Sequence, residues 1–182
     1  MVNDDDQTLV QRCLEGDRDA FAGLVVRYQR PIYNAAYRVL GNAEDASEIT
    51  QVVFMKVAEQ LDDYDPSFKF FSWIYRISIN ESLNLLRRNK REQPLDEEID
   101  LPDSEYASPE ARMIAAQQSA RIQSALMGMK VEHRVVLTLR HFSDCSYGEI
   151  GQILELDDKT VKSRLYEARQ RLRELLQDLH RA

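Results

Sequence analysis

The stretch SYGEIGQILELDDKTVKSRLYEARQRLREL, residues 146–175, decides how the C-terminal part of this chain folds. Its second half places apolar residues three and four positions apart, which puts them on one face of an α-helix. The residues of this apolar face are Val161, Leu165, Ala168, Leu172 and Leu175. The opposite face is cationic and rich in hydroxyl groups, and it carries Lys159, Lys162, Ser163, Tyr166 and Arg173.

A shorter helix precedes this one, and a tight turn separates the two. Ile150 and Ile153 give the shorter helix an apolar side, residues 155–157 form the turn, and Asp157 or Asp158 is suited to cap the second helix. This pattern is typical of a helix-turn-helix, whose second helix enters the major groove of DNA. The alternative is an ordinary basic helix with a solvated face. The preceding helix and turn favour the helix-turn-helix.

The bulk composition bounds the class of protein. The chain has 182 residues, of which 43% are hydrophobic and 30% charged, as in a soluble globular protein. Its apolar runs are shorter than the roughly 18 residues that a membrane span requires. The N-terminal sequence MVNDDDQ is acidic and lacks a signal core, so we expect a cytoplasmic protein.

Neither metal nor catalytic chemistry is expected. Cys13 and Cys145 are far apart and predict reduced thiols. His141 lies four positions before Cys145, but two ligands do not make a zinc site, so we expect neither a metal nor another cofactor. The sequence contains no evident pair of catalytic carboxylates, no nucleophile with a base and no phosphate-binding glycine loop, so we expect no enzyme activity.

The net charge of −7 is unevenly distributed. Residues 1–90 hold 11 Lys/Arg against 14 Asp/Glu, a net charge of −3, and residues 91–111 hold 1 against 8, a net charge of −7. Residues 112–182 hold 12 against 9, a net charge of +3. Because non-specific DNA affinity follows phosphate neutralisation, the free chain is expected to bind duplex DNA weakly and to need a partner.

The acidic segment 91–111 contains three prolines and little apolar periodicity, which predicts an extended, flexible linker. It separates a domain at 1–90 from a domain at 112–182. Both lack clear strand periodicity, so we expect an all-α protein of two small helical domains, the second ending in the helix-turn-helix. The expected helices begin near Leu9, at Asp17, at Pro31, and then cover residues 44–62, 71–89, 109–127 and 131–142. Lys56 interrupts an apolar stripe and is expected to extend its charge to water.

A second nucleic-acid signature lies in FSWIYRISINESLNLLRRNKR, residues 71–91. An aromatic ring and several polar donors cluster within about a third of the circumference of this helix, namely Trp73, Arg76, Asn80, Asn84 and Arg87. Amides and guanidinium groups can read base edges, and an aromatic ring can stack on an unpaired base. The preceding loop at 64–69 is suited to receive an everted base. The alternative is a surface helix whose aromatics serve the core, which is what we expect for Phe71 and Tyr75.

Four motifs in this order resemble those of the extracytoplasmic-function sigma factors, the small two-domain initiation factors of bacterial RNA polymerase. They are DASEITQVVF at 45–54, FSWIYRI at 71–77 with Asn80 and the LRR at 86–88, SYGEI at 146–150 and TVKSRLYEAR at 160–169. The resemblance covers nearly the whole chain. It implies a monomer that binds core RNA polymerase, through the beta-prime clamp and the beta flap, and promoter DNA. An anti-sigma factor is a further candidate partner.

The resemblance also implies which residues carry each contact. Those for core polymerase are Asp45, Glu48, Gln51 and Phe54. Those for the minus-ten element are Asp65, Ser67, Phe68, Lys69, Trp73, Arg76, Asn80, Asn84, Arg87 and Arg88. Those for the minus-thirty-five element are Lys159, Thr160, Lys162, Ser163, Arg164, Tyr166, Glu167 and Arg169. The acidic linker would follow the polymerase channel that later holds RNA.

The chain departs from the family pattern in places: Val52 stands where a glutamate is common, Glu167 where a basic residue is frequent, and Asp157-Asp158 where a proline- or glycine-containing turn is more usual. Two other functions stay open on the residues alone. One is a conventional helix-turn-helix regulator whose N-terminal domain binds a ligand or dimerises. The other is a helical adaptor or anti-sigma antagonist. The polar stripe that begins at Trp73 argues against the first.

Overall fold

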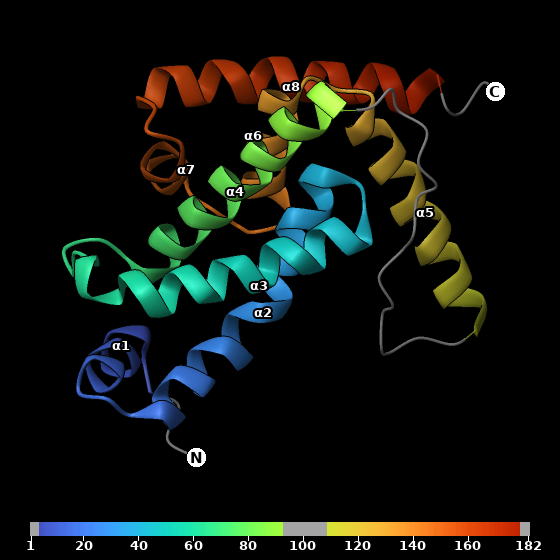
Figure 1. The fold of residues 1–182 in the computed structure, drawn as a ribbon. Coiled ribbons are helices and arrows are strands. Elements are labelled where there is room, and N and C mark those ends of the chain that lie inside the picture. Colours follow the sequence, from blue (N-terminus) through green and yellow to red (C-terminus); the bar gives the residue numbers. More distant parts are fainter. Residues whose placement is uncertain (1–3, 93–108, 179–182) are drawn as a thin grey trace.

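The computed structural model describes residues 4–92 and 109–178, and it is helical throughout this part of the chain, with no strand (Figure 1). The N-terminal module, as we call the first four α-helices, comprises α1 (Asp6–Leu14), α2 (Arg18–Leu40), α3 (Ala43–Gln60) and α4 (Phe70–Glu92), with a 3-10 turn, η1, at Leu61–Asp63. The C-terminal module comprises α5 (Pro109–Met127), α6 (Val131–His141), α7 (Tyr147–Leu154) and α8 (Asp158–Asp178). The predicted all-α fold is confirmed. Most of the predicted linker lies outside the described residues.

Local capping sets the helix boundaries in the N-terminal module. The Asp17 carboxylate accepts hydrogen bonds from the backbone N–H groups of Asp19 and Ala20 and so begins α2. Gly41 ends this helix in the left-handed region, with a φ of 84° that favours glycine. Asn42 then caps α3 by accepting from the N–H of Asp45 at 2.8 Å.

The predicted helix break at Pro31 is wrong, because α2 continues through it to Leu40. A proline inside a helix removes one backbone hydrogen bond and usually interrupts the helix. Here Pro31 lies on the exposed face, while Tyr28, Ile32 and Ala35 on the other face are buried. Burial of this continuous apolar face outweighs the local cost at Pro31.

Lys56 also differs from expectation. Its Nζ lies 2.8 Å from Oε1 of Glu81, so the side chain bridges α3 to α4 instead of extending into water. The apolar positions around it are buried as predicted. They are Ile49, Val53 and Val57, on the helix α3 that contacts α2 and α4. The sequence pattern thus places the apolar face correctly but does not reveal the partner of its one cation.

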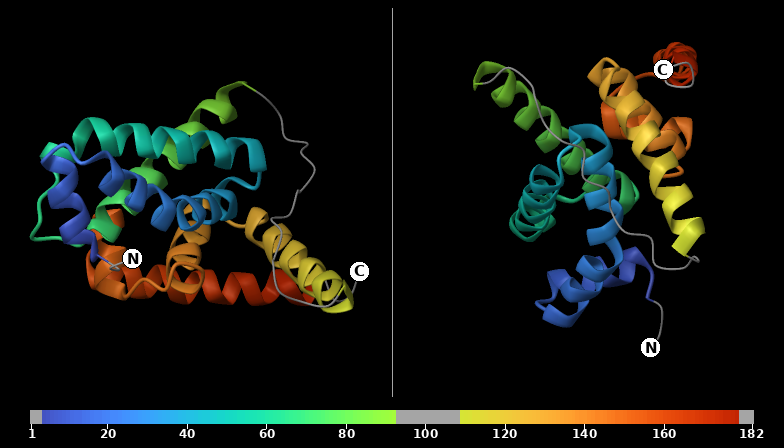
Figure 2. Two further views of the ribbon diagram at one scale, coloured as in Figure 1. Left: turned by 90° about the horizontal axis from the view of Figure 1, so that it is seen from below. Right: turned by 90° about the vertical axis from the view of Figure 1, so that its right-hand side faces the viewer.

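The two modules pack against each other. α7 contacts α4, while α5 and α6 contact α2. Figure 2 shows α3 and α8 on opposite sides of the molecule, with α2 and α6 between them. Buried residues of both modules belong to one hydrophobic cluster. No helix among the described residues is long and apolar enough to cross a membrane.

Candidate nucleic-acid interface

The loop before α4 is held in shape by its own side chains. Tyr64 is buried and donates its hydroxyl hydrogen to the carbonyl oxygen of Phe68 at 2.5 Å. The Asp65 carboxylate accepts from the N–H of Ser67 at 2.9 Å, and this bond is the main reason that the pKa of Asp65 is lowered. Phe68 and Lys69 belong to the same loop, and both are exposed.

The polar stripe predicted on α4 lies on its exposed side. Arg76 and Asn80 are exposed, while Trp73 is half-buried and packs on Tyr64 and Phe70, with ring centroids 5.4 and 5.7 Å apart. Farther along the helix the remaining predicted residues, Asn84, Arg87 and Arg88, are also exposed. As expected, the other aromatics serve the core: Tyr75 is 2% exposed, and half-buried Phe71 packs on it.

A cavity of about 650 Å³ lies beside this stripe. Five predicted minus-ten residues line it, namely Asp65, Phe68, Trp73, Arg76 and Asn80. Ser67, Lys69, Asn84, Arg87 and Arg88 are not part of its lining. Ser72 also lines the cavity, and its buried hydroxyl has no hydrogen-bond partner among the described residues. An aromatic ring beside unpaired polar groups suits an unstacked base.

The opposite wall of this cavity comes from α7 and the turn that follows it, which contribute Gly151, Gln152 and Glu155. Two ion pairs join the walls. Lys69 Nζ lies 2.8 Å from Glu149 Oε1, and Arg76 pairs with Glu155. The bond from Lys69, helped by the N–H of Ser146, lowers the pKa of Glu149 to about 2. Sequence reasoning missed both glutamates as partners of this face.

The helix-turn-helix is built by specific local contacts. Ser146 and Glu149 form a reciprocal capping box at the start of α7, and the Ser-x-x-Glu spacing would have revealed it. Glu155 ends α7 in the left-handed region with a φ of 54°. A side chain at Gly151 would come within 2.8 Å of the Leu156 carbonyl oxygen, so only glycine permits this close turn.

α8 presents its predicted face to solvent. Lys159, Lys162 and Tyr166 are exposed, and the apolar face opposite them is buried at Val161, Leu165 and Ala168. Two more of the predicted residues are exposed and paired with each other, because Ser163 donates to the Glu167 carboxylate at 3.2 Å. Arg164 is half-buried.

Thr160 has a capping role. Its N–H and its hydroxyl both donate to Asp157, at 2.9 and 2.7 Å, which identifies Asp157 as the cap of α8. These two bonds lower the pKa of Asp157. Thr160 is therefore placed to hold the first turn of α8 rather than to project from it.

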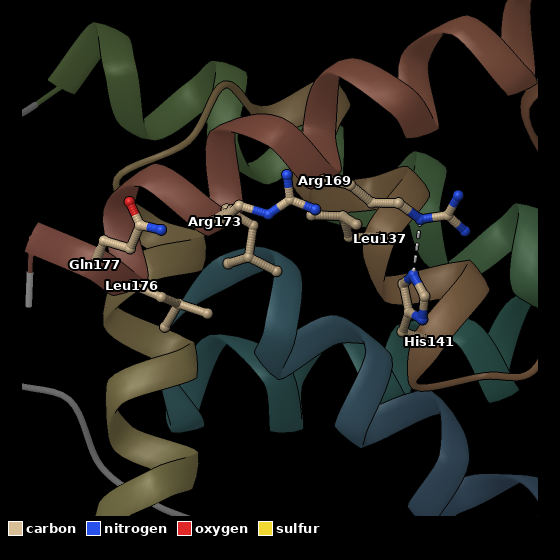
Figure 3. A pocket seen from close by; sticks show the side chains of 7 residues that line it. Leu137, His141, Arg169, Arg173, Leu176 and Gln177 are labelled. Atoms are coloured by element: carbon tan, nitrogen blue, oxygen red, sulfur yellow. Dashed lines mark hydrogen bonds between the residues drawn. The ribbon is translucent and has the colours of Figure 1, made fainter. Parts of the chain in front are cut away.

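Arg169, one of the predicted minus-thirty-five residues, lines a second cavity, of about 850 Å³, between α6 and α8 (Figure 3). Leu137, Leu172 and Leu176 give this cavity an apolar lining. Arg169 Nε donates to His141 Nε2 at 3.4 Å. Burial, together with Arg169 and Arg140, lowers the pKa of His141, so the imidazole stays neutral and accepts this bond near pH 7.

Comparison with known proteins agrees with this geometry. Residues 24–92 match the family description "Sigma-70 region 2", and residues 119–172 match "Sigma-70, region 4". The ECF RNA polymerase sigma factor SigW of Bacillus subtilis is 32% identical, covering 93% of this chain and 96% of its own. The RNA polymerase sigma-H factor of Pseudomonas aeruginosa is 31% identical, covering 100% of this chain and 98% of its own. This chain belongs to the extracytoplasmic-function sigma factors.

The structural comparison extends over both modules. CnrH, solved in complex with the cytosolic domain of CnrY, superposes with a TM-score of 0.75 at 27% identity, covering 96% of this chain and 99% of CnrH. The sigma factor RpoE of Bartonella quintana has the same fold, with a TM-score of 0.72 at 22% identity over 86% of this chain and 96% of its own. The protein is a sigma factor: it acts with RNA polymerase and promoter DNA to direct transcription initiation. A conventional helix-turn-helix regulator is not favoured.

The predicted polymerase-binding residues of this sigma factor all lie on α3 but not in one exposed row. Glu48 and Gln51 are exposed, whereas Asp45 is half-buried in the first turn. Phe54 is half-buried and packs on the hydrophobic core. The accessible polar part of this edge is therefore Glu48 with Gln51. Its apolar part is the partly exposed ring of Phe54.

Proposed function

We propose that residues 1–90 of this sigma factor bind core polymerase and open the minus-ten element, and that residues 112–182 read the minus-thirty-five element. One observation carries the first assignment: the cavity beside α4 is lined by an aromatic ring, a guanidinium group and an amide. These groups are Trp73, Arg76 and Asn80. No catalytic step is assigned to the protein, which acts by binding.

In this proposal one base of the non-template strand leaves the duplex and enters the cavity. Phe68 or Trp73 offers a ring face for stacking. The Asn80 amide offers hydrogen bonds to the base edge. Lys69, Arg76, Arg87 and Arg88 contact the backbone phosphates.

The exposed face of α8 enters the major groove at the minus-thirty-five element. Lys159, Lys162, Ser163 and Tyr166 face the bases, and Arg164 and Arg169 contact the flanking phosphates. Glu167 stands beside this face. A carboxylate accepts a hydrogen bond from cytosine and repels phosphate. Glu167 therefore gives this protein a preferred minus-thirty-five sequence that differs from that of relatives with a basic residue at this position.

The polymerase contacts are divided between the modules. Glu48 and Gln51, with Phe54 beside them, dock α3 on the beta-prime clamp, and the acidic linker follows the channel that later holds RNA. The beta flap binds the C-terminal module, and the apolar cavity lined by Leu137 and Leu172 is its binding site. The free protein is a monomer of the bacterial cytoplasm. The RpoE structure of the same fold is a complex with the anti-sigma factor NepR, which supports an anti-sigma factor as the further partner of this chain.

An Asn80→Ala variant tests the minus-ten assignment. The substitution removes the amide that faces the cavity, so open-complex formation should fall at least ten-fold while affinity for core polymerase is unchanged. Permanganate footprinting on a promoter selected with the holoenzyme measures opening, and co-purification measures core binding. Asn34→Ala, at an exposed position of α2, is the matched control. Equal opening by the two variants would refute the assignment.

A further inference from the structure

Both oxygens of the Glu167 carboxylate lie close to a neighbouring side chain. Ser163, one helical turn earlier on α8, donates its hydroxyl hydrogen to Oε1 at 3.2 Å. Nε2 of His133, on α6, lies 3.6 Å from Oε2. Because the two neighbours belong to different helices, together they restrict where the carboxylate can point.

His133 is the sheltered member of this group. Only 12% of its side chain is exposed, against 59% for the side chain of Glu167, and α6 packs on α8. A ring that carries its hydrogen on Nε2 directs a positive N–H at Oε2, although the distance is longer than that of a hydrogen bond. His133 is therefore placed to hold Glu167 rather than to touch DNA itself.

We propose that Ser163 and Glu167 select a cytosine in the minus-thirty-five element and that His133 is the positioning residue of Glu167. This inference rests on the proposed reading of that element by α8. An ionised carboxylate only accepts hydrogen bonds, so Ser163 uses its one hydrogen on Glu167 and offers DNA its lone pairs. The pair thus presents acceptor oxygens alone to the major groove.

Acceptor oxygens distinguish the four bases by the groups on their major-groove edges. Guanine and thymine present acceptors there and would repel these oxygens, whereas adenine and cytosine carry an amino group. The amino group of adenine lies beside N7, another acceptor, so a second oxygen is disfavoured next to it. Cytosine itself has no acceptor on this edge, and it is therefore the base that best fits two oxygens.

Holding the carboxylate in advance should strengthen this contact. An exposed glutamate samples several rotamers, and ordering it on DNA costs affinity. Ser163 and His133 order the side chain before DNA binds, and the positive N–H of His133 offsets part of the repulsion between the carboxylate and nearby phosphates. Loss of either neighbour should weaken the preference for cytosine even though the carboxylate remains.

A promoter library tests the choice of base. Holoenzyme formed with the full chain transcribes barcoded promoters in which each minus-thirty-five position is randomised in turn, and sequencing of the transcripts gives the preference. At one position cytosine should exceed guanine about ten-fold, as expected for a specific base contact. Glu167→Gln should lower this ratio to about two-fold or less, because an amide donates as well as accepts. An unchanged ratio in this variant would overturn the proposal.

Two substitutions of His133 separate positioning from packing. His133→Leu keeps a side chain of similar size without an N–H, so the cytosine ratio should fall about three-fold. His133→Gln keeps an N–H donor and should restore most of the ratio. His141→Leu, near the end of the same helix, is the matched control and should preserve the ratio, because His141 contacts Arg169 instead of Glu167. Equal ratios in the two His133 variants would refute the positioning role.

A double variant tests whether His133 acts through Glu167. Once Glu167→Gln has removed the carboxylate, adding His133→Leu should cause no further loss of the cytosine ratio. A further loss would contradict positioning through Glu167. Ser163→Ala, at an exposed site, gives a second variant that leaves the packing intact, and it should lower the ratio about two-fold. An unchanged ratio there would remove Ser163 from the contact.

The same library separates this inference from the function on which it rests. If wild type shows no preference at any minus-thirty-five position, the assignment of α8 fails and the cytosine contact fails with it. If Lys162→Ala changes the preference but Glu167→Gln does not, α8 reads the element and only the cytosine contact is refuted. A loss of the cytosine preference in Glu167→Gln, with the other positions unchanged, supports both.

Discussion

Cys145 is a buried thiol directly before the helix-turn-helix. It is fully buried between α6 and α7, and burial, with smaller effects of Glu149 and Asp144, raises the pKa of its thiol to about 12. Its backbone carbonyl accepts from Arg140 at 2.8 Å. The folded protein therefore holds a proton that an unfolded thiol, with a pKa of about 8.5, releases earlier.

Stability should accordingly fall in alkaline solution. A raised pKa in the folded state contributes stability that is fully present below about pH 8.5 and is lost as pH rises toward 12. The contribution of Cys145 should decline by up to about 1.4 kcal/mol per pH unit above pH 8.5. Urea unfolding of wild type and Cys145→Ala between pH 7 and 10 measures it. The slopes should differ, whereas Cys13→Ala, at a half-buried position, should retain most of the wild-type slope. Parallel slopes for wild type and Cys145→Ala would contradict this.

At the scale of one helix, α3 is expected to carry the polymerase contact on a small accessible edge. Glu48→Arg plus Gln51→Ala should abolish holoenzyme formation, because the variant places a cation and a truncated side chain where the docking surface lies. The thermal midpoint should shift little, since both side chains are exposed. Glu15→Arg, an equal charge reversal at the end of α1, should bind core normally. Size-exclusion chromatography with core polymerase measures holoenzyme formation by both variants. Normal binding by the double variant would show that this edge is not the docking surface.

α8 should contain two kinds of DNA contact with different signatures. Losing a phosphate contact weakens binding to all sequences, whereas losing a base contact costs about 1–3 kcal/mol at one position and relaxes specificity there. Arg169→Ala should therefore reduce transcription from all promoters alike. Lys162→Ala and Glu167→Ala should change which minus-thirty-five sequences are tolerated. Selection from a promoter library measures the preference. An unchanged preference in both variants would mean that another face reads the bases.

Helical elements were predictable from the sequence where local chemistry fixes them. Asp17 and Asp157 lie where helix starts were expected, because capping depends only on residues a few positions apart. Pro31 was misread because its cost is local, while the burial that offsets it depends on packing by distant helices. Lys56 was misread for the same reason: its partner Glu81 belongs to the next helix.

At the scale of the whole molecule, the sequence predicts the two modules but not their mutual packing. Apolar periodicity reports that a face is buried, not what buries it. The contacts of Glu155 with Arg76 and of Arg134 with Val39 join residues 79 and 95 positions apart. The candidate site shows the same limit: the stripe on α4 was foreseen from spacing, whereas the wall that α7 adds to it was not.

Arg134 should be the main restraint on separation of the modules. Only 9% of the residue is exposed, and burial lowers the pKa of its guanidinium group without discharging it. Its bond to the Val39 carbonyl crosses between the modules, whereas its hydrogen bond to Met127 stays within its own module. Exposed pairs such as Lys69–Glu149 are screened at 1 M salt, where the Debye length is about 3 Å, but a buried bond is screened much less.

Small-angle X-ray scattering should separate these contributions. The radius of gyration of wild type should change little between 50 mM and 1 M NaCl, because the Arg134 contact persists. Arg134→Ala should expand by several Å at high salt, since the exposed ion pairs are then screened and the Arg134 contact is absent. Arg140→Ala removes an arginine of the same helix whose contacts, with Cys145 and Tyr147, stay within its own module, so it should remain as compact as wild type. Expansion of wild type itself at 1 M NaCl would show that the exposed ion pairs alone hold the modules together.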